Sequence, residues 1–346
     1  MASHRRPKQP SRTRVTVLTT AAAAAVALSS QAANAAPSEK PSKDEVKAKV
    51  DKLYEEAEQA TEKYNGAKEK QEKLQKEIST LQDNVARGQE ELNELRDGLG
   101  SMASAQYRSG GIDPSLQLFL SADPDNYLDK ASTLDQLSGQ QVEALKKIQE
   151  KQRDLAQQRS EASEKLKDLS ATRTELGNKK KEVQGKLSSA QKLLNTLTAQ
   201  EKAALQQEEQ RANRTSERQV LSGKSTPASG RAGAAFAAAQ SKIGTPYVYG
   251  ATGPSSFDCS GLTSWAYAQA GVGIPRTSQA QANYGTRISS MSQLQVGDLV
   301  FFFNDLHHVG LYAGNGQVLH APRTGTNVRY ESMSTIGGPF MFGVRV

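Results

Sequence analysis

The sequence predicts an α+β domain at its C-terminal end, preceded by a long α-helical coiled-coil hairpin. Hydrophobic residues make up only 36% of the 346 residues, below the roughly 45–50% of an ordinary globular chain. A single packed core therefore does not account for the whole length. Nearly all the phenylalanines and the only tryptophan, Trp265, lie beyond Gly233. We therefore expect the packed core in this last part of the chain.

Residues 1–35 have the order of a secretory signal peptide. The first 14 residues carry five basic side chains and no acid, an alanine-rich apolar stretch runs from Val15 to Leu28, and small residues follow. This order predicts cleavage after Ala35; the alternative is an uncleaved membrane anchor. The apolar stretch is shorter than the about 20 residues that a membrane-spanning helix needs. No second stretch of the sequence is apolar enough to span, so we expect no membrane span in the mature chain.

The same basic residues explain most of the formal net charge of +7. Because this charge belongs mainly to a targeting segment, it does not indicate nucleic-acid binding.

Residues 40–210 carry two heptad seams. From Val46 to Met102, apolar residues recur at alternating steps of four and three, and only Gln71 and Gly88 interrupt them. A second seam runs from Tyr127 to Ala204 with more polar members. A sustained heptad pattern is typical of coiled coils, and the Gly- and Pro-containing break between the seams predicts an antiparallel hairpin. The break holds four apolar residues available to a partner: Leu116, Leu118, Phe119 and Leu120.

The sequence leaves the role of this hairpin open. It is a spacer, a self-association device, a partner-binding arm or a lid over the domain that follows. Residues 211–233 are rich in Ser, Thr, Gly, Pro, Arg and Asn, which predicts a flexible linker.

Residues 234–346 predict helices first and an antiparallel sheet afterwards, the order of an α+β domain. Gly314-Asn315-Gly316 between two apolar runs is a strong hairpin signal. The expected helices are Ala234–Ile243 and Cys259–Ala270, and the expected strands are Val296–Phe303, His308–Tyr312, Gln317–His320, Val328–Tyr330 and Phe342–Val346.

Cys259 is the only cysteine of the chain, so it cannot form an internal disulfide. It lies at the predicted start of a helix, where backbone N–H groups and the helix dipole favour a thiolate. An imidazole beside the thiol can take its proton and so convert it into a nucleophilic thiolate. Asp258 would oppose the thiolate, and we assign it to helix capping or substrate binding. The alternative for Cys259 is a buried, inert side chain.

Two histidines suit that chemistry. His308 opens one strand of the predicted hairpin and His320 closes the other, so the two side chains are expected to meet across the pair. His308 is the expected base, and His320 orients its imidazole. We expect His307 on the opposite face, in a loop or at the surface. A zinc site is the weaker alternative, because neighbours on a strand face opposite ways and no H-E-x-x-H or C-x-x-C motif is present.

Six short motifs follow one another in the last part of the chain: G-T-P-Y-V-Y-G at 244–250, F-D-C-S-G-L at 257–262, P-R-T-S at 275–278, V-G-D-L-V-F-F at 296–302, H-V-G-L-Y at 308–312 and H-A-P at 320–322. In this order they resemble the NlpC/P60 family of cell-wall cysteine peptidases over about 234–346. The signal peptide and coiled coil before them are similar to those of secreted actinobacterial members. One departure is Tyr249-Gly250-Ala251, where the family commonly has Trp-Gly-Gly.

The resemblance implies a papain-like fold and a secreted, cell-wall-associated enzyme that needs no cofactor. The implied partner is a peptidoglycan stem peptide, cut between D-γ-glutamate and the diamino acid. By matching positions, Cys259 is the nucleophile, His308 the base and His320 the third polar residue. Tyr247 helps to hold the oxyanion, and Asp258 and Ser260 line the substrate site.

Two other functions remain as alternatives. One is a coiled-coil cell-wall or division scaffold whose C-terminal domain only binds. The other is a thiol amidase or acyltransferase acting on another cell-wall amide. A further hypothesis is that the hairpin folds back over the site, or docks on an activating protein partner.

Overall fold

The computed structural model describes residues 41–108, 116, 127–222 and 230–346. The predicted signal peptide and most of the predicted joint of the hairpin lie outside the described residues. Within those residues, no helix is both long and apolar enough to cross a membrane.

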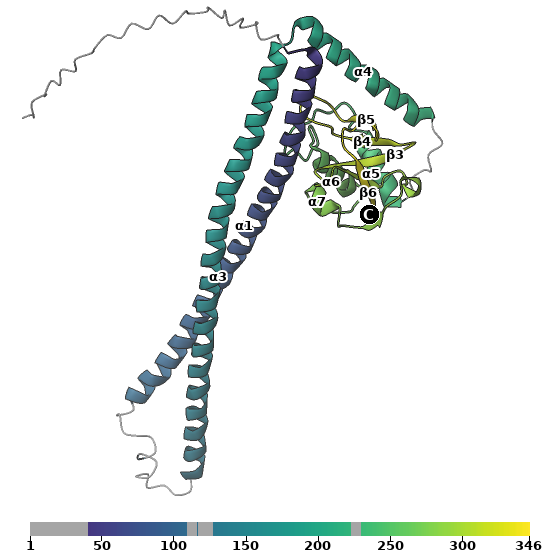
Figure 1. Ribbon diagram of the computed structural model, residues 1–346. Coiled ribbons are helices and arrows are strands. Elements are labelled where there is room, and N and C mark those ends of the chain that lie inside the picture. The colour runs from purple at the N-terminus through teal and green to yellow at the C-terminus, as the bar shows by residue number, and fades with distance from the viewer. Residues whose placement is uncertain (1–40, 109–115, 117–126, 223–229) are drawn as a thin grey trace, which may run out of the picture. The chain divides into compact units, whose positions relative to one another are not determined.

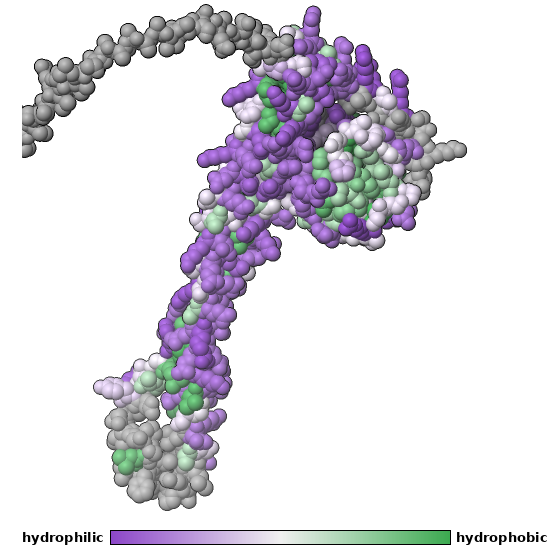
Figure 2. Space-filling model, in the orientation of Figure 1, coloured by the Kyte–Doolittle hydropathy of each residue, from purple (hydrophilic) through white to green (hydrophobic). Residues whose placement is uncertain are grey.

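Two long helices, α1 (Lys43–Arg108) and α3 (Tyr127–Thr196), form the predicted hairpin and run antiparallel (Figure 1). Helix α1 starts at a capping box: Glu45 N donates to Ser42 Oγ (3.2 Å), and Ser42 N donates to Glu45 Oε2 (3.1 Å). The seam buries small clusters along its length, such as Leu92 with Ile148 and Leu155. The visible face outside this seam is mostly hydrophilic (Figure 2), as a two-helix coiled coil requires.

Ion pairs between the two helices keep a constant antiparallel register. Lys186 pairs with Glu56 and Lys165 with Glu77, each at 2.7 Å, and Lys151 pairs with Glu91. As the α1 member advances along the chain, its α3 partner retreats by the same number of residues. The coiled-coil hairpin expected from the heptads is therefore present.

Helix α4 (Ala199–Ser222) follows α3 after a short break. Thr198 and Glu201 form a second capping box, with Glu201 Oε2 accepting from Thr198 N at 2.8 Å. The structure corrects the linker predicted over 211–233, because α4 continues to Ser222 and the next helix begins at Gly230. Residues 211–222 contain no Gly or Pro, and their Arg, Glu and Gln are good helix formers.

The C-terminal domain has the predicted α+β arrangement. Its sheet has the order β1-β6-β2-β3-β4-β5, and every pairing is antiparallel. Three helices precede the sheet: α5 (Gly230–Gln240), α6 (Cys259–Gln269) and α7 (Ser278–Gln281). The strands are β1 (Thr286–Ile288), β2 (Leu299–Phe302), β3 (His308–Gly314), β4 (Gln317–His320), β5 (Arg329–Ser332) and β6 (Phe340–Arg345), and a 3₁₀ turn, η1, spans Met291–Gln293.

The core lies between α6 and the sheet, where Leu262, Phe301 and Leu311 are fully buried. Strand β1 was not predicted, because three residues with two exposed side chains carry no period-two signal. The predicted turn at 314–316 is present, and Asn315 has a φ of 54° there, as tight hairpins require. This hairpin brings the ends of β3 and β4 together beside α6.

Candidate active site

Cys259 is the first residue of α6, directly after the N-cap Asp258. The Asp258 carboxylate accepts a hydrogen bond from Gly261 N at 2.7 Å, which is the capping role expected of it. The thiol is only 1% exposed, and its Sγ lies 3.6 Å from the carbonyl oxygen of His307. The nucleophile candidate therefore lies between the start of a helix and the start of β3.

The pKa of Cys259 is raised well above its ordinary value, because the thiol is buried and faces the carboxylates of Glu62, Asp258 and Glu58. The sequence predicted the opposite direction from the helix N-terminus alone. That contribution is real but modest, and burial together with three nearby carboxylates outweighs it. In this state the thiol is protonated at neutral pH.

His308 and His320 meet across the β3–β4 hairpin, as the sequence predicted. Nε2 of His308 lies 2.8 Å from Nδ1 of His320, and the two rings are perpendicular with centroids 5.0 Å apart. Both side chains are buried. The contact leaves Nδ1 of His308 as the nitrogen available to a thiol.

His307 lies in the loop directly before β3, as one of the two expected placements had it. It is not at the surface, however, because its side chain is fully buried. Its ring stacks on Phe303 with centroids 4.1 Å apart, and its Nδ1 contacts Asp305. Glu58 approaches its other nitrogen at 4.0 Å. A neighbouring aromatic ring and helix α1 cover the side chain that strand alternation directs away from His308.

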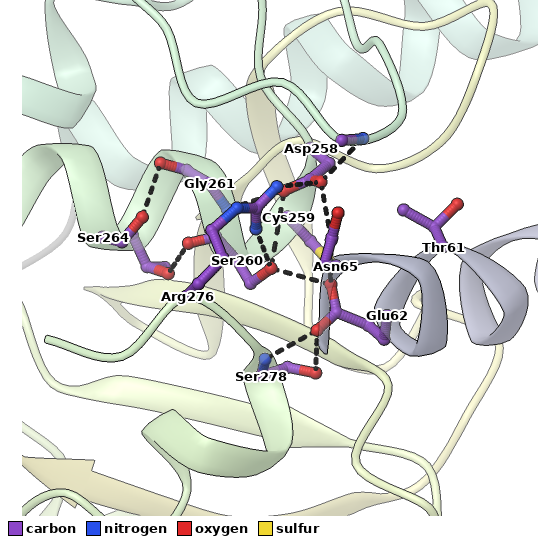
Figure 3. A network of polar contacts seen from close by, with 12 residues as sticks. Thr61, Glu62, Asn65, Asp258, Cys259, Ser260, Gly261, Ser264, Arg276 and Ser278 are labelled. Carbon is purple, nitrogen blue, oxygen red and sulfur yellow. Dashed lines mark hydrogen bonds and ion pairs between the residues drawn. The ribbon is translucent and has the colours of Figure 1, made fainter. Parts of the chain in front are cut away.

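A polar cluster surrounds the thiol (Figure 3). Arg276 donates from Nη2 to Asp258 Oδ2 (2.6 Å) and from Nη1 to Ser260 Oγ (2.7 Å). Ser260 and Ser278 are fully buried beside it. Sequence reasoning placed Asp258 and Ser260 here and missed Arg276 and Ser278. Both residues belong to the P-R-T-S motif at 275–278, to which the sequence analysis assigned no role.

Helix α1 of the coiled coil enters this cluster through Glu62, which is 2% exposed (Figure 3). Its Oε2 accepts from the backbone N (2.7 Å) and Oγ (3.0 Å) of Ser278, and its Oε1 accepts from Ser260 Oγ at 2.7 Å. The thiol of Cys259 lies 3.8 Å from the same Oε1. Burial and the nearby Asp258 raise the pKa of Glu62 to about 7, although these hydrogen bonds oppose the shift.

Two more α1 residues, one turn on either side of Glu62, contact the site. Oε2 of Glu58 lies 3.5 Å from Nδ1 of His308, and Asn65 Nδ2 donates to Asp258 Oδ2 at 3.0 Å. Positions spaced by three and four residues share one face of a helix, so one stripe of α1 touches both the thiol side and the histidine side. Sequence reasoning missed this stripe, because polar residues outside a heptad seam are expected to face solvent.

Tyr247 is buried, and it forms an isolated bridge with Phe257, two residues before the thiol. Burial, followed by the charges of Glu58 and Cys259, raises its pKa well above the ordinary value. The phenol therefore keeps its proton and is a hydrogen-bond donor. Among the described residues, no group of three or more His, Cys, Asp or Glu is arranged to hold a metal ion.

Gly261 supports the nucleophile through close backbone packing, and Gly261→Ala is expected to lower the melting temperature and the activity. An added Cβ would lie 2.1 Å from the carbonyl oxygen of Ala251 and 2.8 Å from Asp258 Oδ1. Overpacking of this kind costs about 1–3 kcal/mol. Thermal unfolding measures the effect. Gly273→Ala is the control, since its Cβ would meet nothing within 4 Å; equal melting temperatures for the two variants would contradict the prediction.

Comparison with known proteins finds similarity in the C-terminal domain. Residues 244–341 match the model of the NlpC/P60 family. A probable endopeptidase of Corynebacterium glutamicum is 51% identical over 119 residues, which are 34% of this chain and 56% of that protein. A probable endopeptidase of Mycobacterium tuberculosis is 42% identical over 100 residues, 29% of this chain and 26% of that protein. The chain thus spans only about half, or less, of the length of these relatives.

Among solved structures, the NlpC/p60 domain of the peptidoglycan hydrolase SagA is 39% identical to this chain. The match covers 33% of this chain and 98% of that one, with a TM-score of 0.31.

Proposed function

We propose that this protein, whose residues 244–341 match the NlpC/P60 family model, is a secreted, cell-wall-associated cysteine peptidase that hydrolyses peptidoglycan stem peptides. One observation carries the proposal: the only cysteine starts a helix beside a strand whose first histidine is in contact with a second histidine at 2.8 Å. We propose that it cleaves the bond between D-γ-glutamate and the diamino acid. The relatives named as endopeptidases support the reaction class.

The mechanism uses groups of this chain alone. Nδ1 of His308 takes the thiol proton, and Sγ of Cys259 attacks the amide carbonyl. The backbone N–H of Cys259 and the phenol of Tyr247 stabilise the oxyanion, which is worth about 3–4 kcal/mol per donor. Protonated His308 then gives its proton to the leaving amine. Water hydrolyses the thioester and frees the thiol.

We also propose that the structure is an inhibited form, in which the α1 stripe of Glu58, Glu62 and Asn65 blocks the site. Glu62 occupies the hydrogen-bond donors of Ser260 and Ser278, and Glu58 takes the position beside Nδ1 of His308. The thiol is both covered and protonated. A substrate therefore needs α1 to move, and a protein partner acting on the hairpin is one way to move it.

Mass spectrometry of muropeptides released from purified peptidoglycan tests the bond. We expect products that carry a free amine on the diamino acid and a free γ-carboxyl on D-glutamate. The control is Cys259→Ala, which should release none of them. Products cut between the sugar lactyl group and L-alanine would instead indicate an amidase. No product from the wild-type chain or from a Glu62→Lys variant would favour a scaffold.

A further inference from the structure

We propose that Glu331 is a positioning residue that fixes the tautomers of His308 and His320 and so prepares His308 to accept a proton. The catalytic consequence rests on the proposed function. The tautomer assignment itself does not depend on that function, because it involves only side chains of this chain. Glu331 belongs to β5, beyond the two histidines, and does not touch the thiol.

The argument begins with the proton shared by the two rings. Only one hydrogen fits between Nε2 of His308 and Nδ1 of His320, which are 2.8 Å apart. For Nδ1 of His308 to accept the thiol proton, Nε2 must carry the hydrogen. His320 must then accept at Nδ1 and carry its own hydrogen on Nε2. That nitrogen lies 3.3 Å from Oε2 of Glu331.

The sheet register places the carboxylate there. His320 of β4 pairs with Arg329 of β5, and Glu331 is two residues further along the same strand. Residues two apart share a face of a strand, so Arg329, Glu331 and His320 project together. The side chain of Glu331 is 16% exposed, and that of His320 is 2% exposed. Arg329 donates to Glu331 Oε2 from Nε (3.0 Å) and Nη2 (2.7 Å).

The charges agree with this assignment. Burial opposes ionisation of Glu331, but His320 and Arg329 outweigh it and lower its pKa to about 2. Burial lowers the pKa of His320 to about 4, although Glu331 opposes that shift. At neutral pH the carboxylate is thus an ionised acceptor and His320 is a neutral ring. In the closed chain, Glu58 of α1 lies 3.5 Å from Nδ1 of His308, where a carboxylate favours hydrogen on that nitrogen, so the tautomers are tested in a Glu58→Ala chain.

The opposite tautomer would stop the reaction. If His320 carried its hydrogen on Nδ1, it would donate to Nε2 of His308. His308 would then carry its own hydrogen on Nδ1, the nitrogen that must receive the thiol proton. A carboxylate accepts hydrogen bonds and never donates them when ionised, so a Glu331 oxygen beside a bare Nε2 disfavours this state.

Nuclear magnetic resonance of the full Glu58→Ala chain with ¹⁵N-labelled histidine tests the tautomers without the competing carboxylate of Glu58. In this parent chain at neutral pH, we expect hydrogen on Nε2 of both His308 and His320. In Glu331→Gln, the amide can also donate, so we expect the Nδ1–H form to appear in both rings. Glu331→Asp keeps the charge and should restore the spectrum of the Glu58→Ala parent. Asp305→Asn is the matched control, because it removes a carboxylate beside His307 only.

Nδ1–H rings in the Glu58→Ala parent, or Nε2–H rings that persist unchanged when Glu331→Gln is added, would overturn the proposal. Kinetics supply a second readout that simple misfolding would not reproduce. In the Glu62→Lys background, where α1 is expected to leave the site, Glu331→Gln should lower kcat about tenfold with little change in KM. No hydrolysis by any variant would contradict the proposed function, and the spectra would still decide the role of Glu331.

Discussion

Replacing Glu62 by lysine in the full chain is expected to raise peptidoglycan hydrolysis about tenfold or more. The carboxylate accepts three hydrogen bonds from Ser260 and Ser278, and a lysine ammonium accepts none. Its positive charge would also approach Arg276, which already donates to Ser260. Removing one partner of a buried, hydrogen-bonded charge costs about 3–5 kcal/mol. Each 1.4 kcal/mol is about a factor of ten in the closed-to-open ratio, so about tenfold is the smallest increase in hydrolysis that we expect.

A second measurement tests the same variant without peptidoglycan. Cys259 is 1% exposed when α1 lies over the site, so iodoacetamide should alkylate it slowly in the wild type. Alkylation should be faster in Glu62→Lys by a similar factor. Glu69→Lys is the matched control, because it makes the same charge change on an exposed position of α1. Equal alkylation and hydrolysis in all three chains would show that Glu62 does not hold the site closed.

The domain and its reacting groups could be predicted because their signals are local. A Gly-Asn-Gly turn fixes the β3–β4 pairing, and that pairing alone brings His308 to His320. The start of α6 at Cys259 follows from Asp258, whose side chain is a good helix cap. Each of these inferences needs only the residues within one supersecondary unit.

The contact between α1 and the site could not be predicted in the same way. Glu58 and Glu62 are ordinary residues for the outer face of a coiled coil, and the heptad pattern accounts for them without a partner. Their burial depends on groups about 200 to 250 residues away in the sequence, and no periodicity reports such a contact. The same distance explains the wrong direction expected for the thiol pKa. The sequence shows the helix N-terminus beside Cys259, but not the carboxylates that α1 adds.

Replacing Cys259 by alanine in the Glu62→Lys background is expected to lower hydrolysis about a thousandfold or more. The released chain is the right background, because basal activity of the closed chain leaves little range for a further loss. Cys259→Ser is the sharper variant: a hydroxyl fills nearly the same space beside the His307 carbonyl, but it is a far weaker nucleophile without full activation. Hydrolysis retained by both variants would contradict a thiol mechanism.

Release of α1 should also change the ionisation of the thiol. In the closed chain, burial and the carboxylates of Glu62, Asp258 and Glu58 raise the pKa of Cys259. Moving α1 away removes Glu62 and Glu58 and admits water, while the helix N-terminus and His308 remain. The thiolate is the form that alkylates, so the pH at half-maximal alkylation should fall in Glu62→Lys relative to the wild type. An unchanged midpoint with a faster rate would mean that α1 only covers the thiol, whereas a lower midpoint would mean that it also keeps the nucleophile protonated.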